Sequence, residues 1–218
     1  MNLSTLRTQI SSFVGDPDQT RYTAQMYLDA ANRAQEQFAL DTKSLWKDTT
    51  WTTVSGTATY DLPSNFMWEQ FVTYDSKPLN PITRLDAVRL YGSDWATATG
   101  APGAFIIDPE EAQKKILLVP IPQEAKTLGM RYFPLPTALS SDSDIPLNSS
   151  ALMAQFHIGL AAYAAWLLLM SEKEPGNAIV QKMRQLERIY ADSVTKATDT
   201  FKNTASRGLR ITGGAVWS

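Results

Sequence analysis

Few residues of this sequence could carry out chemistry. His157 is the only histidine, and cysteine is absent. A Ser-His-Asp relay would therefore have to be built around His157. That residue stands in an apolar segment with helical character, where a histidine is more typical of a core or an interface than of a catalytic site. Without a second histidine or a thiolate, the sequence predicts no transition-metal site.

Two pairs of carboxylates are spaced as they are in calcium-binding loops. Asp16 and Asp18 flank a proline, and Asp142 and Asp144 flank a serine. Neither pair continues with the glycine and the distal glutamate of an EF-hand. We therefore interpret both pairs as loop residues that are solvated or that lead into a helix.

Two other motifs are also poor candidates for catalysis or ligand binding. The stretch 99–103, Thr-Gly-Ala-Pro-Gly, lacks the lysine and the serine or threonine of a phosphate-binding loop, so we predict a turn. Glu110-Glu111 and Lys114-Lys115 form a run of both charges, which is typical of a surface loop in a hairpin. Taken together, His157, the carboxylate pairs and these two motifs predict a protein with no catalytic residue, no cofactor and no metal ion.

The charge balance argues against a nucleic-acid clamp. The formal net charge is -2 at pH 7 and the basic residues are scattered, whereas a clamp needs many cations on one face. Charged residues make up 19% of the chain, below the roughly 25% that is usual in soluble domains. Together with six tryptophans, this low share indicates either a surface that other chains cover or a well-filled core.

Helical periodicity is found toward both ends of the chain. Near the N-terminus an apolar stripe predicts a short helix; its members are Leu3, Leu6, Ile10 and Phe13. A second helix is expected from about Thr23, whose hydroxyl can cap it, to about Thr42. Tyr22 and Tyr27 are placed to contact each other across its first turn.

Two more helices are expected after residue 150. Residues 153–170 are almost continuously apolar, which predicts a helix buried on all sides. Its about 18 residues just reach transmembrane length, but His157 inside the segment and the few flanking cations favour a buried helix. After Gly176 a longer helix has a charged face and an apolar seam. The seam consists of Ile179, Met183, Leu186, Tyr190, Val194, Ala197 and Phe201.

Between residues 46 and 133 the apolar period becomes two, which predicts β structure. The strands expected here are residues 49–54, 57–61, 68–74, 105–107, 115–119 and 127–133. The first two flank Ser55-Gly56 and predict a hairpin. Thr83 and Asp86 predict the capping box of a short helix that ends at Gly92. Pro120-Ile121-Pro122 predicts that the strand before it ends there or lies at an edge.

The sequence therefore predicts an α+β protein: an α-helical bundle with an inserted small β-rich domain and an extended C-terminal tail. We expect the bundle to comprise residues 1–45 and 148–203, the β-rich domain residues 46–147 and the tail residues 204–218. The tail has three glycines and no helical period, yet it retains apolar residues, so we expect it to dock on another surface. The residues expected to make that contact are Arg207, Leu209, Arg210, Ile211, Val216 and Trp217.

The order of several short motifs resembles one protein family. The motifs are Arg21-Tyr22-Thr23 before a helix with Asn32 and Ala34; Tyr60-Asp61-Leu62-Pro63 with Phe66; Thr73-Tyr74-Asp75 with Lys77-Pro78-Leu79; Thr99-Gly100 with Pro102; Leu118-Val119-Pro120 with Pro122; Arg131-Tyr132; and Asp144-Ile145-Pro146 before Phe156-His157. Over residues 20–175 they resemble the head-to-tail adaptors of tailed bacteriophages, also known as head-completion or gatekeeper proteins.

The resemblance implies a structural protein of the virion that is not an enzyme. Copies of it, about twelve, would form a homo-oligomeric ring below the portal protein, at the head-tail junction. The ring would contact tail or nozzle proteins on its other side, and double-stranded DNA would pass through its channel without sequence recognition. The tail would then dock on the portal. No membrane contact is implied, and the absence of cysteine fits assembly in the reducing host cytoplasm.

Two alternatives remain open at this point. Carboxylates from distant loops of the β-rich region could converge in a virion-associated enzyme such as a glycosidase. Four tryptophans in and around that region, Trp46, Trp51, Trp68 and Trp95, could belong to a carbohydrate-binding or receptor-binding module. Tryptophans in an inserted domain are, however, more often part of a core or of a subunit interface.

Overall fold

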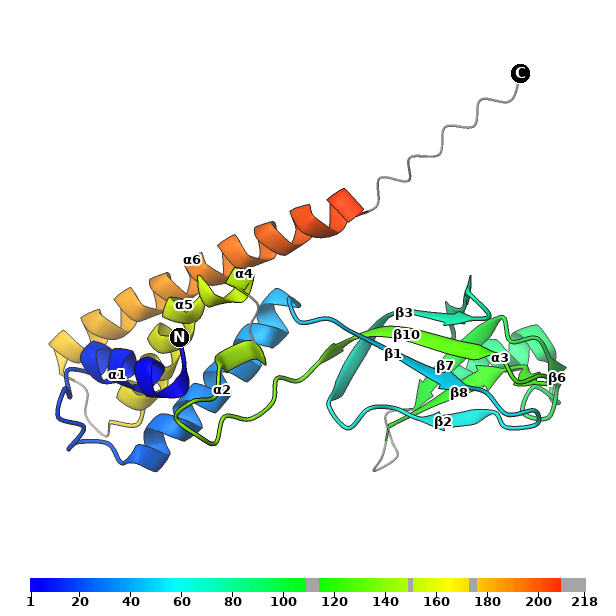
Figure 1. Cartoon of the computed structure of the whole chain (residues 1–218), viewed down its shortest axis with the longest axis horizontal. Helices are drawn as coiled ribbons and strands as arrows, with labels where there is room; N and C mark the ends of the chain where they lie inside the picture. The colour runs from blue at the N-terminus through cyan, green and yellow to red at the C-terminus, as the bar shows by residue number, and fades with distance from the viewer. Residues whose placement is uncertain (109–113, 149–150, 173–175, 209–218) are drawn as a thin grey trace, which may run out of the picture. The chain divides into compact units, whose positions relative to one another are not determined.

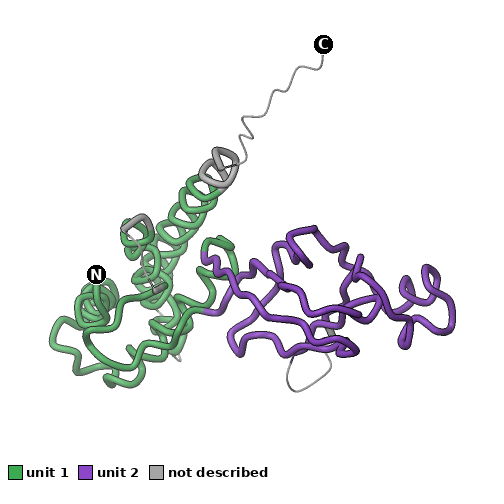
Figure 2. The backbone as a smooth tube through the Cα atoms, turned by 45° about the vertical axis from the view of Figure 1, so that its right-hand side comes forward, with its two compact units in different colours: residues 1–44, 136–218 green, residues 45–135 purple. Residues whose placement is uncertain are grey.

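The chain divides where its apolar periodicity changes. The computed structural model describes residues 1–108, 114–148, 151–172 and 176–208 (Figure 1). Figure 2 shows two compact units, a helical unit of residues 1–44 and 136–218 and a β unit of residues 45–135. The protein therefore has the predicted α+β class, with β structure inserted between helices.

The first two helices of the helical unit begin and end at local capping signals. Helix α1 (Leu3–Val14) is capped by the Asn2 side chain and ends at Gly15, whose φ is 79°. Helix α2 (Ala24–Thr42) begins as predicted, because the Thr23 side chain accepts a hydrogen bond from the N–H of Met26. The predicted contact before it is also confirmed, with the Tyr22 and Tyr27 ring centroids 6.0 Å apart.

Helix α5 (His157–Met170) is the centre of the helical unit and contacts α1, α2 and α6 (Asn177–Gly208). Most of its residues are buried, as predicted, although Ile158 and Met170 are exposed. It contains Gly159, where an added Cβ would lie 2.5 Å from the Cβ of Ser193 on α6. The backbones of α5 and α6 can approach this closely only because residue 159 has no side chain.

The apolar segment 153–170 is two helices instead of the predicted one. After the 3-10 turn η1 (Pro146–Asn148), α4 (Ala151–Ala154) stops short of α5. The break at Phe156 places its ring against Phe38 and Phe201, at centroid distances of 6.2 and 6.3 Å. At the break, the Phe156 ring therefore packs against aromatic rings of α2 and α6. Within the described ranges, no helix combines the length and the apolar character needed to span a membrane.

Helix α6 carries the predicted seam and continues farther than predicted. Leu186 and Ala197 on the seam are buried, whereas the charged residues Arg184, Glu187 and Arg188 are exposed. The helix runs to Gly208, so the prediction that the helical period ends at residue 203 is wrong. The stop signal is the glycine at 208.

The β unit has two four-stranded sheets. Sheet A has the order β1-β10-β3-β4, and sheet B has the order β2-β8-β7-β5, with β6 and β9 forming a separate pair. The bounds are β1 Lys47–Thr52, β2 Thr59–Asp61, β3 Phe66–Tyr74, β4 Lys77–Pro78, β5 Asn80–Pro81, β6 Thr99–Gly100, β7 Ala104–Asp108, β8 Lys115–Val119, β9 Ile121–Pro122 and β10 Thr127–Pro134. The expected strands 68–74, 105–107, 115–119 and 127–133 are therefore confirmed.

The predicted hairpin around Ser55-Gly56 is wrong. A turn is present, with the Thr57 N–H donating to the Val54 carbonyl at 3.0 Å and Gly56 at φ 79°. The strands on either side nevertheless diverge, because β1 pairs with β10 in sheet A and β2 pairs with β8 in sheet B. The turn thus carries the chain from one sheet to the other.

The β unit is layered in the order sheet A, sheet B and α3. The predicted inward face of β10 (Leu128, Met130 and Tyr132) is buried, and it packs with residues of β7 and β8 between the two sheets. Helix α3 (Arg84–Tyr91) has the predicted capping box and ends at Gly92. Its buried Ala87 packs on Ile106 and Val119. Helix α3 therefore covers the outer face of sheet B, on the side opposite the core.

The inserted unit begins and ends on neighbouring strands. Lys47 in β1 stands opposite Tyr132 in β10 in the antiparallel register. The stretch 136–147, which the sequence pattern placed in the β-rich domain, belongs to the helical unit. It is held there by α2, because the Asn32 side chain bonds to both backbone groups of Leu139 and the Gln35 side chain bonds to Thr137 and Leu147.

Candidate interaction surfaces

The outer face of sheet A carries aromatic residues and one ion pair. Because Met130 and Tyr132 point into the core, the alternating residues Arg131 and Phe133 point outward. Arg131 donates two hydrogen bonds to the Asp48 carboxylate, at 2.7 and 2.8 Å. These bonds lower the pKa of Asp48. The guanidinium also lies 5.7 Å from the ring centroid of Phe71, whose side chain is 46% exposed.

Two tryptophans extend this face. Trp46 and Trp68 lie on either side of Phe133, with ring centroids 5.7 and 5.5 Å from it. We call the set the sheet A face: Trp46, Asp48, Trp68, Phe71, Arg131 and Phe133. Tryptophan, other aromatic residues and arginine are the types enriched at the centres of protein interfaces. The composition of the sheet A face is therefore that of a surface that contacts protein.

A second exposed apolar surface lies on α3. Leu85 and Val88 are 59% and 42% exposed, and the Arg89 side chain is 69% exposed. These three residues have i, i+3 and i+4 spacing and share one side of the helix, opposite the buried Ala87. We call them the α3 face. No described residue of the β unit covers it.

The four tryptophans that suggested a carbohydrate-binding module have different roles. Trp51 packs against the core between the sheets, and Trp95 packs against the cluster under α3. The rings of Trp46 and Trp68 are inclined at 58° and 41° to Phe133. The exposed aromatic rings therefore do not form the flat platform on which a sugar ring could stack.

A small pocket beside the end of sheet A is lined mainly by polar residues and turns. Its volume is about 250 Å³, and its lining includes Gly100 and Pro102 from the predicted turn at 99–103. Lys126, also in the lining, lies 3.9 Å from the Asp75 carboxylate and 3.4 Å from that of Glu124. A second lysine, Lys77, also belongs to the lining. The predicted turn at 99–103 is wrong for its first two residues, because Thr99–Gly100 form strand β6, which pairs with β9.

Asp16 organises the loop between α1 and α2. Its buried carboxylate accepts hydrogen bonds from the N–H groups of Thr20, Arg21 and Tyr22 and from the Tyr27 hydroxyl, at 2.9 to 3.3 Å. Burial opposes its charge, but these bonds outweigh the effect and keep the pKa of Asp16 below its ordinary value. The carboxylate is a structural acceptor, as the loop interpretation predicts.

Replacing Asp16 by asparagine should lower the melting temperature of the protein by several degrees. The amide keeps the size of the side chain but loses the charge that strengthens the four hydrogen bonds. Asp18→Asn is the matched control, because Asp18 is two residues away and exposed. Thermal unfolding followed by circular dichroism measures both variants. Equal melting temperatures for the two would show that the network around Asp16 is not stabilising.

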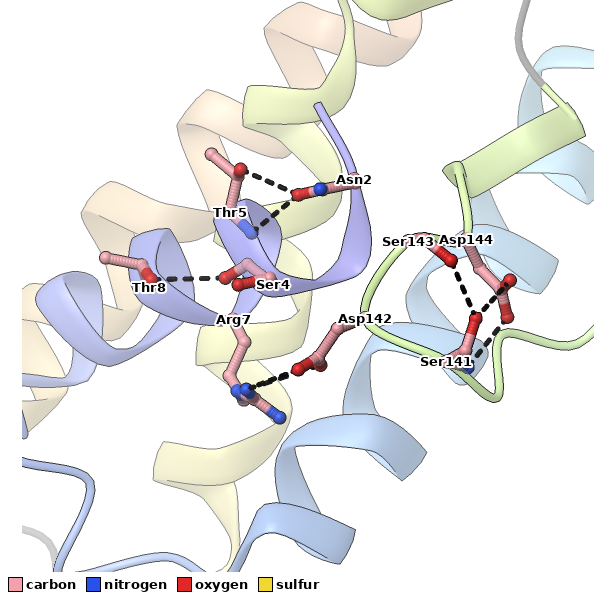
Figure 3. A network of polar contacts seen from close by, with 9 residues as sticks. All are labelled: Asn2, Ser4, Thr5, Arg7, Thr8, Ser141, Asp142, Ser143 and Asp144. Carbon is pink, nitrogen blue, oxygen red and sulfur yellow. Dashed lines mark hydrogen bonds and ion pairs between the residues drawn. The ribbon is translucent and has the colours of Figure 1, made fainter.

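The second carboxylate pair ties a loop to the start of α1 (Figure 3). Asp144 accepts hydrogen bonds from the N–H groups of Ser140 and Ser141 and from the Ser141 hydroxyl, which hold its pKa well below the ordinary range. Asp142 pairs with Arg7 at 3.3 Å. The N–H of Leu3 donates to the Asp144 carbonyl at 2.8 Å. Asp16, Asp142 and Asp144 are therefore structural, and among the described residues no cluster of three potential metal ligands occurs.

His157 lies in the core at the start of α5. It is fully buried, and neither ring nitrogen has a hydrogen-bond partner among the described residues. Burial lowers its pKa to about 4, and the N-terminal amino group adds to this shift. The side chain is therefore neutral at pH 7. Among the described residues no hydrogen bond joins it to a carboxylate or a hydroxyl. It is a core histidine, as predicted, although its ring nitrogens are not satisfied by hydrogen bonds there.

The first motif of the family resemblance contributes to stability. Arg21 pairs with Glu172 at 2.8 Å, and the Tyr22 hydroxyl donates to the same carboxylate at 2.6 Å. These contacts lower the pKa of Glu172 and join the start of α2 to the end of α5. Thr23 caps α2. The motif Arg21-Tyr22-Thr23 therefore fixes the helical unit and is not itself a binding site.

Several residues expected to act in binding lie outside the described residues. Residues 209–218 include five of the six proposed docking residues, Leu209, Arg210, Ile211, Val216 and Trp217, and fall outside the described ranges. Arg207 lies in the last turn of α6, but its side chain is not described. Glu110-Glu111 also falls outside. Its neighbour Lys114 donates a hydrogen bond to the Phe66 carbonyl at 3.2 Å.

Comparison with known protein families supplies the identity of the chain. The sequence model of the family described as SU10 adaptor protein matches residues 1–210, which include all of the β unit and every helix. The chain belongs to the SU10 adaptor protein family. This match confirms the predicted resemblance to phage head-to-tail adaptors. As a member of the SU10 adaptor family, the chain is a structural protein of a bacteriophage. A comparison with curated proteins gives no match.

Proposed function

We propose that copies of this chain form a ring below the portal that joins the capsid to the tail and leaves a channel for DNA. The observation that carries the proposal is the match of the adaptor family over residues 1–210. The ring has about twelve copies and closed cyclic symmetry, so that each copy contacts its two neighbours through different surfaces. Portal protein binds on one side of the ring, and tail or nozzle proteins bind on the other, at the head-tail junction of the virion.

The charge and the surfaces of the chain support this function. Its net charge of -2 suits a channel that does not hold DNA by its phosphates. The sheet A face and the α3 face leave apolar and aromatic side chains exposed on the β unit. Nothing in the geometry of His157 or of the carboxylate pairs favours catalysis. These observations support a protein that binds other proteins and carries out no reaction.

The C-terminal residues of the chain provide its contact with the portal. Helix α6 ends at Gly208, and ten residues follow it in the sequence. The apolar residues among them are Leu209, Ile211, Val216 and Trp217, together with Ala215, and the basic residues Arg207 and Arg210 lie close to the end of the helix. In this proposal the apolar residues bind the portal surface and the two arginines pair with carboxylates beside them.

Deleting residues 209–218 should leave a folded protein that no longer binds its portal. The deletion begins after the last residue of α6, so the described helices stay whole. Negative-stain electron microscopy of the chain alone and of the chain mixed with purified portal measures the result. We expect rings on the portal for the full-length chain and bare portals for the deletion.

A same-length variant separates the apolar contact from the length of the tail. In it, Leu209, Ile211, Val216 and Trp217 are replaced by serine. We expect this variant also to lose binding, because it keeps the chain length and removes only apolar area. Undiminished portal binding by the deletion would exclude the tail as the docking element. Portals without rings even with the full-length chain would contradict the function itself.

A further inference from the structure

From the layering of the β unit we infer that, in the assembled ring, the sheet A face of one copy packs on the α3 face of the next copy. This inference rests on the proposed ring function and names the surfaces that neighbouring copies use. The occupant of each face is thus a second copy of the same chain.

The two faces point in opposite directions. Sheet A and sheet B enclose one core between them, and α3 packs on the other side of sheet B through Ala87. The order of layers is therefore sheet A, sheet B, α3. The sheet A face lies at one end of this order, and the α3 face, with Leu85 opposite Ala87, lies at the other end. Two different surfaces on opposite sides are the requirement for head-to-tail contact in a closed ring.

Each face lacks a covering layer within the β unit. Sheet B is covered on one side by sheet A and on the other by α3, whereas the outer side of sheet A has no such layer among the described residues of the unit. Sheets with apolar residues are stabilised by a helix or a second sheet packed on them. Within one copy, α3 covers the outer side of sheet B. In the ring, α3 of the neighbouring copy would cover the outer side of sheet A in the same way.

Each face carries an ion pair with an exposed member, Asp48–Arg131 on the sheet A face and Arg89–Asp86, at 3.7 Å, on α3. Asp48 is on the sheet A face, and its side chain remains 64% exposed although it pairs with Arg131. Arg89 is on the α3 face, and its side chain is 69% exposed. Leu85 and Val88 beside Arg89 would pack on Phe71, which is 46% exposed. In such a contact, Phe71, Leu85 and Val88 would form an apolar centre. The exposed carboxylate of Asp48 on one face and the exposed guanidinium of Arg89 on the other would fix its orientation.

A symmetric pairing of two sheet A faces fits less well. It would bring two Asp48–Arg131 pairs together and would leave Leu85 and Val88 on α3 exposed. It would also produce a dimer related by a two-fold axis, which does not continue into a ring. The head-to-tail contact uses both exposed faces in every copy.

Cross-linking tests this contact directly, because the chain contains no cysteine. In the variant Phe71→Cys/Leu85→Cys, assembled on the portal and treated with a short bis-maleimide, each copy should be joined to its neighbour. Denaturing gel electrophoresis should then show a ladder of dimers, trimers and higher species. Each single variant should stay monomeric on the gel. The control Phe71→Cys/Val54→Cys pairs the same sheet position with an exposed residue of the β unit that belongs to neither face and should give no ladder.

A second variant measures the energetic importance of the contact. Leu85 is 59% exposed, so Leu85→Asp should leave the circular dichroism spectrum unchanged. We expect it to raise the concentration needed for half-maximal ring assembly about tenfold or more, as removal of a central interface contact does.

The outcomes separate the inference from the proposed function. Rings that form on the portal but give no ladder with Phe71→Cys/Leu85→Cys would overturn the inference and leave the adaptor function intact. Dimers formed by Phe71→Cys alone would also overturn it, because they require a symmetric contact. If Leu85→Asp assembles as the wild type does, the α3 face is not in the interface. If the wild-type chain forms no ring on the portal, the proposed function and the inference fail together.

Discussion

An alanine at position 159 should destabilise the protein by about 2 kcal/mol, the size of effect that overpacking typically has. In an exposed helix the same change is stabilising, by about 1 kcal/mol, because alanine has the higher helix propensity. At Gly159 the new methyl group would stand 2.5 Å from the Cβ of Ser193 and 2.8 Å from its hydroxyl oxygen. Helices α5 and α6 would have to move apart, with loss of packing along the whole seam.

A double-mutant cycle with Ser193→Gly identifies the cause. Ser193→Gly removes the atoms that the alanine would meet, so the two changes together should cost less than the sum of their separate effects. Chemical denaturation gives the four free energies of unfolding. Gly176→Ala, at a position with no atoms within 4 Å of the added methyl group, is the control and should change stability by about 0.5 kcal/mol or less. Additive effects at 159 and 193 would show that α5 and α6 do not meet there.

Acidification should destabilise the protein through His157. The pKa of this side chain is about 4 in the folded protein and near 6.5 in the unfolded chain. Between these pH values the unfolded chain binds a proton that the folded protein does not, so the free energy of unfolding decreases as the pH falls from 6.5 to 4. The slope is about 1.4 kcal/mol per pH unit and the total is on the order of 3 kcal/mol. Below pH 4 both states are protonated and this contribution no longer changes.

The variant His157→Leu separates the contribution of the histidine to the pH dependence of stability from that of the carboxylates. Leucine is similar in size and leaves no unpaired ring nitrogen in the core, so the variant should be at least as stable as the wild type at pH 7. Urea denaturation at intervals from pH 4 to pH 7.5 should give a difference between the two proteins that grows toward low pH. The carboxylates are the same in both proteins, so their contribution to the pH dependence cancels when the two free energies of unfolding are subtracted. A difference that is constant across this range would mean that His157 becomes protonated in the folded state as easily as in the unfolded chain.

The elements that depend on neighbouring residues could be predicted from the sequence. Thr23 caps α2, and Thr83 and Asp86 form the predicted capping box of α3, because each signal acts within one helical turn. The buried face of β10 followed from strict alternation at Leu128 and Met130. In each case the residue that determines the structure lies within four positions of the residue that it affects.

The elements that depend on distant partners could not be predicted. The strands flanking Ser55-Gly56 have the pattern of a hairpin, yet β1 finds its partner in β10, and that pairing between distant segments has no local signature. Likewise, the continuous apolar pattern at 153–170 contains no proline to mark the break before His157. Phe156, at the break, packs on rings from α2 and α6, and those positions are set by the tertiary structure.

The candidate surfaces were only partly visible in the sequence. Composition is compatible with a surface that other chains cover and equally with a well-filled core, and Trp46 and Trp68 belong to the tryptophans in and around the β-rich region. The sequence does not predict that Phe71 and Leu85 belong to exposed surfaces, because alternation shows that a residue is on one side of a strand or helix and not which side has a covering layer. The order of the layers in the β unit determines which side is covered, and this order follows from the pairing of distant strands into two sheets.

The two ends of the β unit lie on neighbouring strands, which would make this unit easy to lose or replace during evolution. Its first strand and its last strand are antiparallel neighbours, and the Cα atoms of the paired residues Lys47 and Tyr132, near the two ends of the insertion, lie about 5.5 Å apart. A short loop could bridge that gap. Genetic exchange could therefore remove this module, or substitute another for it, while the helices stay as they are, and phages with different tails could share one helical scaffold.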